Sequence, residues 1–174
     1  MIHYLKYQSP IGLLTITADN TAVTGLWIDG QKHFAAGIML PDTETNAHPI
    51  LQKTAHFLDG YFSGSLQTFS LPLRPAGTDF QQLVWACLLK IPYGSTVTYG
   101  QIAKKLSQIN GKSMSAQAVG NAVSRNPISI LIPCHRVIGA NGDLVGYAGG
   151  LKAKQALLLL ESQNCKRPEG DLLL

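Results

Sequence analysis

The 174-residue sequence is poor in charge, in cysteine and in long apolar runs. Only 14% of its residues are charged and 45% are hydrophobic, which excludes an intrinsically disordered chain because the apolar surface is sufficient to offset the entropy lost on folding. The longest apolar run, residues 156–160, is far too short to cross a bilayer, and residues 1–10 lack the apolar stretch of a secretory signal. These absences predict a compact protein without a membrane partner.

The three cysteines, Cys87, Cys134 and Cys165, have no close partner along the sequence. This spacing argues against a disulfide framework and against a paired-cysteine zinc or redox motif. Four of the five histidines precede residue 57, whereas every cysteine follows residue 86, so no local cluster of metal ligands forms. We therefore predict no metal and a cytoplasmic location.

Positive charge is concentrated in the second half of the chain. Residues 1–78 contain 4 Lys or Arg and 5 Asp or Glu, whereas residues 79–174 contain 10 and 5, a net charge of +5. Such an excess suits a polyanion, because cations that neutralise phosphates release counterions. A solvated basic surface would explain the same numbers.

The first half has the pattern of a small sheet covered by one helix. Residues 2–29 alternate apolar and polar side chains between turn sequences, which predicts a strand meander. Residues 50–62 have apolar side chains at helical spacing, namely Leu51, Ala55, Leu58 and Phe62. A last strand is expected over residues 69–73, and a linker follows it. The first predicted domain therefore spans residues 1–76.

Residues 79–174 predict a second, mainly helical domain, so the expected fold class is α+β. Asp79 is a candidate N-cap for a helix that places Cys87 in the core, together with Phe80, Leu83, Val84 and Leu88. Thr98 can cap a helix over residues 99–106, and Ser115 can cap another over residues 116–124. Two short helices joined in this way are typical of a helix-turn-helix.

The second helix of this pair is built from small residues, including Ala116, Ala118, Gly120 and Ala122. A slim helix can approach a nucleic-acid backbone closely, and a minor groove about 6 Å wide favours such a helix for binding that ignores base sequence. Small residues also allow close packing between helices inside a protein core.

The reactive groups are concentrated in residues 133–136, at the end of an apolar, strand-like run over residues 130–137. A thiol has an ordinary pKa of about 8.5, so a nucleophilic Cys134 needs a base or a positive charge, which His135 and Arg136 can supply. Adjacent side chains of a strand point to opposite faces, so Cys134 and His135 can cooperate only if the chain turns there. A buried cysteine beside a structural histidine is the alternative.

A longer motif resembles a known family. Pro133-Cys134-His135-Arg136-Val137, preceded by Asn126-Pro127-Ile128 and followed by the glycine-rich residues 146–150, is similar to the active-site sequence of the O6-alkylguanine-DNA alkyltransferases. The resemblance covers nearly all of residues 79–174 and, more loosely, the first half. It implies a ribonuclease H-like first domain and a second domain of winged helix-turn-helix character.

The resemblance also implies a reaction: irreversible transfer of a methyl or other alkyl group from O6 of guanine, and to a lesser extent from O4 of thymine, to Cys134. His135 would take the thiol proton through a water, and Glu161 would orient His135. Tyr99 would donate a proton toward the leaving guanine, and Asn126 would tie the preceding turn to the active-site segment. Without the motif, Glu161 would pass for a surface acid at a helix end, and Asn126 for a simple turn residue before Pro127.

The flipped base would lie in a pocket lined by Val137, Tyr147 and Ala148. DNA contacts are implied for six residues, namely Tyr99, Gly100, Ala116, Gln117, Gly120 and Arg136. The expected partner is double-stranded DNA containing O6-alkylguanine, the expected state is a monomer, and the chemistry needs no cofactor because the cysteine keeps the alkyl group.

Two features depart from the family pattern. Gln117 stands where the family often has an arginine that enters the duplex, so the opened base stack loses a stabilising cation. The turn over residues 107–114 is about four residues longer than the family's, which could lengthen either helix or add a DNA contact through Lys112. For residues 165–174 we expect a surface strap without a function of its own.

Three other functions fit the sequence less well. A non-enzymatic relative that binds alkylguanine DNA and recruits other repair would lack the acceptor, whereas Cys134 is present. A helix-turn-helix regulator would need base-reading side chains, which residues 116–122 offer too sparsely. A papain-like hydrolase needs a histidine from a distant segment, yet His135 is the only histidine after residue 56.

Overall fold

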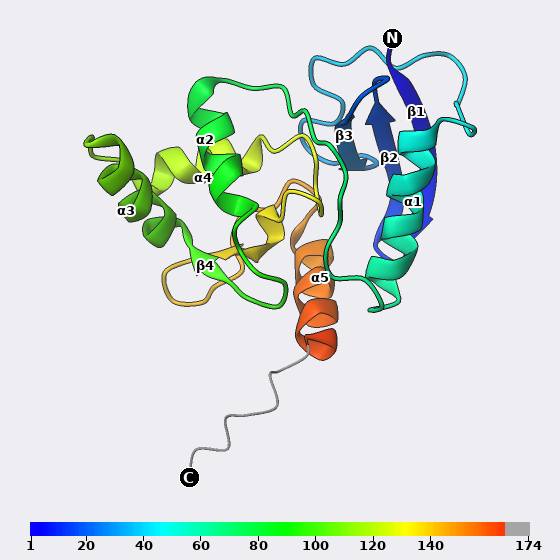
Figure 1. Cartoon of the computed structure of the whole chain (residues 1–174). Helices are drawn as coiled ribbons and strands as arrows, with labels where there is room; N and C mark the ends of the chain where they lie inside the picture. Colours follow the sequence, from blue (N-terminus) through cyan, green and yellow to red (C-terminus); the bar gives the residue numbers. More distant parts are fainter. Residues whose placement is uncertain (166–174) are drawn as a thin grey trace.

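The protein, described here over residues 1–165 of a computed structural model, has the α+β fold that the sequence predicts (Figure 1). Three antiparallel strands, β1 (His3–Ser9), β2 (Gly12–Ala18) and β3 (Val23–Ile28), form a sheet in the order β1-β2-β3. Helix α1 (Pro49–Phe62) lies along one face of this sheet. The expected strap over residues 165–174 lies, apart from Cys165, outside the described residues.

Local chemistry sets the two turns of the meander. At the first turn Ser9 Oγ donates to the carbonyl of Gly12, whose φ of 120° is a conformation that favours glycine. At the second turn the carboxylate of Asp19 accepts from the backbone N–H groups of Thr21 and Ala22. The predicted meander is therefore confirmed.

The expected last strand over residues 69–73 is wrong, because only Leu73 pairs with the sheet, in a single bridge to Val23. The N–H of Val23 donates to the carbonyl of Pro72, and the N–H of Arg74 donates to the carbonyl of Val23. Pro72 and Pro75 have no N–H to extend this pairing, so the ladder ends after one residue.

The second half contains short helices and two short strands. They are α2 (Asp79–Leu88), β4 (Val97–Thr98), α3 (Tyr99–Asn110), α4 (Ala116–Ser124), the 3-10 turn η1 (Cys134–Arg136), β5 (Val137–Ile138) and α5 (Leu151–Asn164). Strands β4 and β5 pair in parallel. In Figure 1, α5 stands between the sheet with α1 on one side and the group of α2, α3 and α4 on the other.

Helix α2 differs from the prediction in two details. Thr78, and not Asp79, is its N-cap, because the Thr78 hydroxyl accepts from the N–H of Gln81 while the Gln81 side chain accepts from the N–H of Thr78. Cys87 is only half-buried. Trp85 is the buried residue on this part of α2, and its indole N–H donates to the carbonyl of Ala122 on α4 at 2.9 Å.

The helix pair α3 and α4 has the predicted caps, Thr98 and Ser115. Helix α3 continues four residues beyond its expected end, as far as Asn110. Gly111 then ends the helix with a φ of 66°, a left-handed conformation that glycine adopts without strain.

Strand β3 joins the two halves of the protein. The N–H of Leu26 donates to the carbonyl of Pro127, and the N–H of Ser129 donates to the carbonyl of Leu26, both at 2.9 Å. Residues 127–129 lead directly to Cys134, so the sheet fixes the position of the reactive segment.

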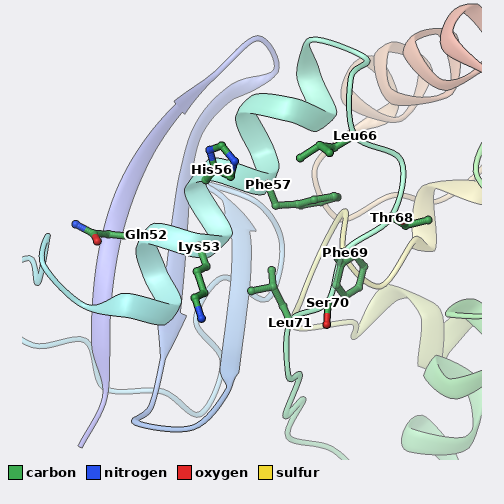
Figure 2. A pocket seen from close by; sticks show the side chains of 9 residues that line it. All are labelled: Gln52, Lys53, His56, Phe57, Leu66, Thr68, Phe69, Ser70 and Leu71. Carbon is green, nitrogen blue, oxygen red and sulfur yellow. The ribbon is translucent and has the colours of Figure 1, made fainter.

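A separate cavity of about 420 Å³ lies between α1 and residues 66–71 (Figure 2). Phe57 from α1 and Phe69 from the facing segment meet edge to face with ring centroids 5.4 Å apart. None of the residues that line this cavity is a predicted site residue.

The packing of β3 gives a first prediction. A Cβ on Gly25 would lie 1.8 Å from the ring of Trp27, which is 1% exposed. Gly25→Ala should therefore lower the free energy of unfolding by about 1 to 3 kcal/mol in urea denaturation. Gly100→Ala is the control, because its Cβ would meet nothing nearer than 3.9 Å and alanine favours a helix. Equal stability of Gly25→Ala and wild type would contradict the steric argument.

Candidate active site

The chain turns at Cys134, so the strand expected over residues 130–137 is wrong for all but its last residue. Residues Cys134–Arg136 form a 3-10 turn, and β5 begins only at Val137. Before the turn, Ile130 has a φ of 70°, a strained conformation that costs a β-branched residue on the order of 1 to 3 kcal/mol. The turn frees Cys134 and His135 from the opposite orientations that a strand would impose.

Asn126 holds the segment that enters this turn. Its side-chain oxygen accepts from the N–H of Ile128 at 3.0 Å, and its amide donates to the carbonyl of Ile132 at 2.8 Å. Asn126 is 4% exposed, so these bonds are shielded from water. The side chain thus ties the turn before the motif to the reactive segment, which is the geometry expected of it.

Cys134 is a buried thiol, only 5% exposed. Burial raises its pKa, and a hydrogen bond from Asn126 and the charge of Lys154 offset only part of that effect. The sulfur is therefore protonated at rest and needs a base before it can act as a nucleophile.

His135 is positioned to be that base. Its Nε2 lies 2.7 Å from Oε1 of Glu161, and because a carboxylate only accepts, Nε2 carries the proton and Nδ1 has the free lone pair. Nδ1 is buried without a partner among the described residues. Burial lowers the pKa of His135 more than Glu161 raises it, so the imidazole is neutral and able to take a proton.

Glu161 is completely buried on α5 and accepts five hydrogen bonds from four residues. Its Oε1 accepts from Tyr61, His135 and Arg136 at 2.8, 2.7 and 2.9 Å, and its Oε2 accepts from Arg136 at 2.8 Å and from the N–H of Gly94 at 3.1 Å. Burial alone would raise the pKa of this carboxyl, but the hydrogen bonds from His135 and Arg136 and the positive charge of Arg136 lower it to about 2. Glu161 is thus the fixed anion of the site.

Arg136 points into the protein and away from the DNA contact expected of it. Its guanidinium bonds to Glu161 and to the carbonyl of Ile91 at 2.6 Å, and the residue is 8% exposed. The physical reason is the buried carboxylate, which would remain uncompensated if the guanidinium turned to solvent.

Sequence analysis missed two buried residues of the site, Lys154 and Tyr61. The ammonium of Lys154 donates to the carbonyls of Val137 and Val145 at 2.5 and 2.9 Å, which ties β5 to the loop over residues 139–150. Lys154 and Glu161 are seven residues apart and lie on the buried face of α5 with Leu157 between them, and this helical spacing of two charges with a leucine was the available signal. Tyr61 was missed because the buried face of α1 contains Tyr61 and not the expected Phe62.

Of the residues expected around the base, Val137 directly follows the reactive turn, and Tyr147 lies near enough to Cys134 for the two groups to interact electrostatically. Val137 is buried, and Tyr147 and Ala148 are half-buried. The hydroxyl of Tyr147 is buried without a partner among the described residues, and burial raises its pKa well above the ordinary value. Tyr99 donates to the carbonyl of Val145 at 3.1 Å, so its hydroxyl already faces the loop that contains Tyr147.

The residues expected to contact DNA, apart from Arg136, lie on α3 and α4. Gly100, Ala116 and Gln117 are exposed, whereas Gly120 is half-buried with the ring of Tyr99 beside it. The small residues of α4 lie in two environments: Ala122 packs into the core, whereas Ala116 at the start of the helix is exposed.

Over residues 1–165, no three or more His, Cys, Asp or Glu side chains gather in a way that could hold a metal ion. In the same part of the chain, no helix is long and apolar enough to span a membrane.

Comparison with known proteins decides the family. Residues 79–163 match the DNA binding domain of 6-O-methylguanine DNA methyltransferase, and residues 2–75 match its ribonuclease-like domain. The chain belongs to the 6-O-methylguanine DNA methyltransferase family. The resemblance stated from the sequence is thereby confirmed, as are the ribonuclease-like and DNA-binding parts of the fold.

Individual relatives agree over nearly the whole chain. A methylated-DNA–protein-cysteine methyltransferase of Methanosarcina acetivorans is 42% identical over 92% of this chain and 98% of its own, and one of Mycobacterium leprae is 45% identical over 92% and 93%. The crystal structure of Mycobacterium tuberculosis OGT in complex with DNA is 41% identical, with a TM-score of 0.80, and covers 93% of this chain and 94% of its own.

The Glu161 network predicts a specific acid sensitivity. Because the pKa of this carboxyl is about 2 in the folded protein against 4.5 for the free group, its stabilisation is complete above about pH 4.5 and is lost as the pH falls toward 2. Wild type should lose roughly 3 kcal/mol of unfolding free energy over that range from this group.

Denaturant titrations at each pH measure the effect. Glu161→Gln should be less stable at neutral pH but should change less between pH 4.5 and 2, whereas the exposed-site control Glu44→Gln should follow wild type. An acid dependence of Glu161→Gln as steep as that of wild type would show that Glu161 does not carry it.

Proposed function

We propose that this protein repairs alkylated DNA by direct reversal, moving a methyl or other alkyl group from O6 of guanine, and to a lesser extent from O4 of thymine, to Cys134. The observation that carries the proposal is the buried thiol of Cys134 followed directly by a neutral imidazole that is held by the Glu161 carboxylate. This is the order of nucleophile, base and orienting group that activates a thiol. The methylated-DNA–protein-cysteine methyltransferases among the relatives support the same reaction.

The thiol proton leaves through Nδ1 of His135. Because Nε2 is bonded to Glu161, Nδ1 is the nitrogen that can receive the proton, by way of a water between it and the sulfur. The imidazolium that forms is stabilised by the carboxylate that already faces it.

The transfer breaks the bond between the alkyl carbon and O6 as the sulfur forms its bond to the same carbon. The electron pair of the broken bond remains on the purine, and a hydrogen bond from Tyr99 stabilises the charge that develops there. In the net reaction the thiol proton ends on the guanine. Cys134 becomes a thioether without a good leaving group, so each molecule acts once and needs no cofactor.

The target atom lies inside the duplex, so the base must be flipped out at a cost of a few kcal/mol. We assign its pocket to Val137, Tyr147 and Ala148. Tyr99 would exchange its bond to the Val145 carbonyl for one to the base. The partner is double-stranded DNA containing O6-alkylguanine, bound by a monomer through Gly100, Ala116, Gln117 and Gly120, and the site of action is the cytoplasm. We place the boundary between the two domains at residues 77–78.

Intact mass tests the acceptor. Wild type incubated with a duplex containing O6-methylguanine should gain one methyl group per molecule and then stop, and Cys134→Ala should gain none. Cys87→Ala is the matched control, since this thiol lies on α2, outside the proposed site, and its variant should be methylated like wild type. Duplex binding without any mass change would favour the non-enzymatic binding protein instead.

A substitution at Gln117 tests whether the start of α4 contacts DNA. Gln117→Arg adds a cation at the exposed start of α4, so binding to duplex DNA should tighten at low salt. In a plot of the logarithm of affinity against the logarithm of salt concentration, the slope should become steeper by about one. Gln163→Arg, at an exposed position of α5, adds the same charge away from α4 and should change neither quantity. Identical salt slopes for both variants would remove position 117 from the DNA contact.

A further inference from the structure

Tyr61 brings a hydroxyl group from the first half of the chain to the acceptor centre, by which we mean Cys134, His135 and Glu161. It lies on the last turn of α1, is 1% exposed, and donates to Oε1 of Glu161 at 2.8 Å. The same hydroxyl oxygen lies 3.5 Å from Nε2 of His135. These three residues are separated by 74 and 26 positions in the sequence, so their meeting is a product of the fold.

The ring of Tyr61 is held on two sides. Tyr93 meets it edge to face with centroids 6.0 Å apart, and Phe57 packs against it at the same distance. The hydroxyl therefore has a fixed direction. Its proton remains in place at all accessible pH values, because burial and the negative charge of Glu161 raise the pKa of Tyr61 far above its ordinary value.

The acceptor oxygen is shared. Oε1 of Glu161 accepts from Tyr61, from His135 and from Arg136, so a donor that withdraws electron density from this oxygen weakens the pull of the carboxylate on the imidazole proton. Without the tyrosine hydroxyl, more negative charge would face His135, and the charged imidazolium would form at a higher pH.

We propose that Tyr61 is a positioning residue of the acceptor centre: its hydroxyl orients the Glu161 carboxylate and sets the basicity of His135, so the first half of the chain takes part in the chemistry. The proposal rests on the roles given above to Cys134, His135 and Glu161. Tyr61 contacts neither the alkyl group nor the base, and it acts only through its two polar neighbours.

The test is the pH dependence of alkyl transfer by the full chain, measured as the second-order rate with O6-methylguanine duplex. Tyr61→Phe keeps the ring and removes the hydroxyl. The acid limb of its profile, where His135 becomes protonated, should move to higher pH by about half a unit, and the plateau rate should fall about 3- to 10-fold as the carboxylate loses one orienting bond.

Tyr7→Phe is the matched control. It removes a tyrosine hydroxyl that bonds to Asp59, which lies on α1 like Tyr61 but is not one of the residues of the acceptor centre. Its acid limb should coincide with that of wild type. A loss of thermal stability in Tyr61→Phe with an unmoved acid limb would reduce Tyr61 to a packing residue and overturn the proposal, as would an equal shift in Tyr7→Phe.

Replacement of Tyr61 alone by 3-fluorotyrosine gives an independent test that does not depend on the folding of Tyr61→Phe. The fluorinated phenol is a stronger hydrogen-bond donor, so the acid limb should move in the opposite direction, to lower pH. An unmoved limb, or one that moves upward, would contradict the proposal. If wild type itself transfers no alkyl group, or Cys134→Ala still does, the proposed function fails, and that outcome is read separately from any variant at position 61.

Discussion

The structure of the reactive centre depends on one buried anion. A carboxylate without exposure to water is costly unless every oxygen lone pair finds a donor, and Glu161 meets that condition with five hydrogen bonds. The donors come from α1, from the loop after α2 and from the turn that contains the acceptor cysteine. Satisfying this single group therefore forces three distant parts of the chain to meet at a fixed geometry. The same bonds determine which nitrogen of His135 has the proton.

Burial also explains why both reacting groups are neutral at rest. It raises the pKa of Cys134 and lowers that of His135, so the thiol and the imidazole are both uncharged in the buried site. A thiolate would be more reactive toward any electrophile that reached it. For a cysteine that can be used only once, a protonated resting state protects the acceptor until a substrate brings the carbon, the water and the base into line.

The accuracy of prediction from the sequence follows the range of the interactions involved. Thr98 and Ser115 were identified as caps because a capping hydroxyl bonds to a backbone group three residues away, within the same segment. The direction of Arg136 and the inward face of α1 at Tyr61 depend on Glu161, a hundred residues from Tyr61 in the chain, and no local pattern contains that information. The motif resemblance supplied Cys134, His135 and Glu161 together, but it gave no sign that the first half of the chain reaches them. The strand predicted at residues 69–73 failed for a local reason, the two prolines. The prediction gave more weight to the alternation of apolar residues than to these prolines.

Access to Cys134 is restricted in the resting structure. The sulfur of Cys134 is shielded by the fold, and the bonds from Tyr99 and Lys154 to the Val145 carbonyl hold the loop over residues 139–150 across the centre. In the proposed function, an extruded base would replace the Val145 carbonyl as the acceptor of the Tyr99 proton, whereas a small alkylating molecule in solution offers no equivalent acceptor. The hydroxyl of Tyr99 that bonds to this loop at rest is thus the same group that the proposed function assigns to the departing guanine. Lys154 donates to the carbonyls of both Val137 and Val145, so it holds the loop over residues 139–150 against the strand that follows the reactive turn. Its charge also lowers the pKa of Cys134 against the effect of burial. One buried cation therefore links this loop to the reactive sulfur.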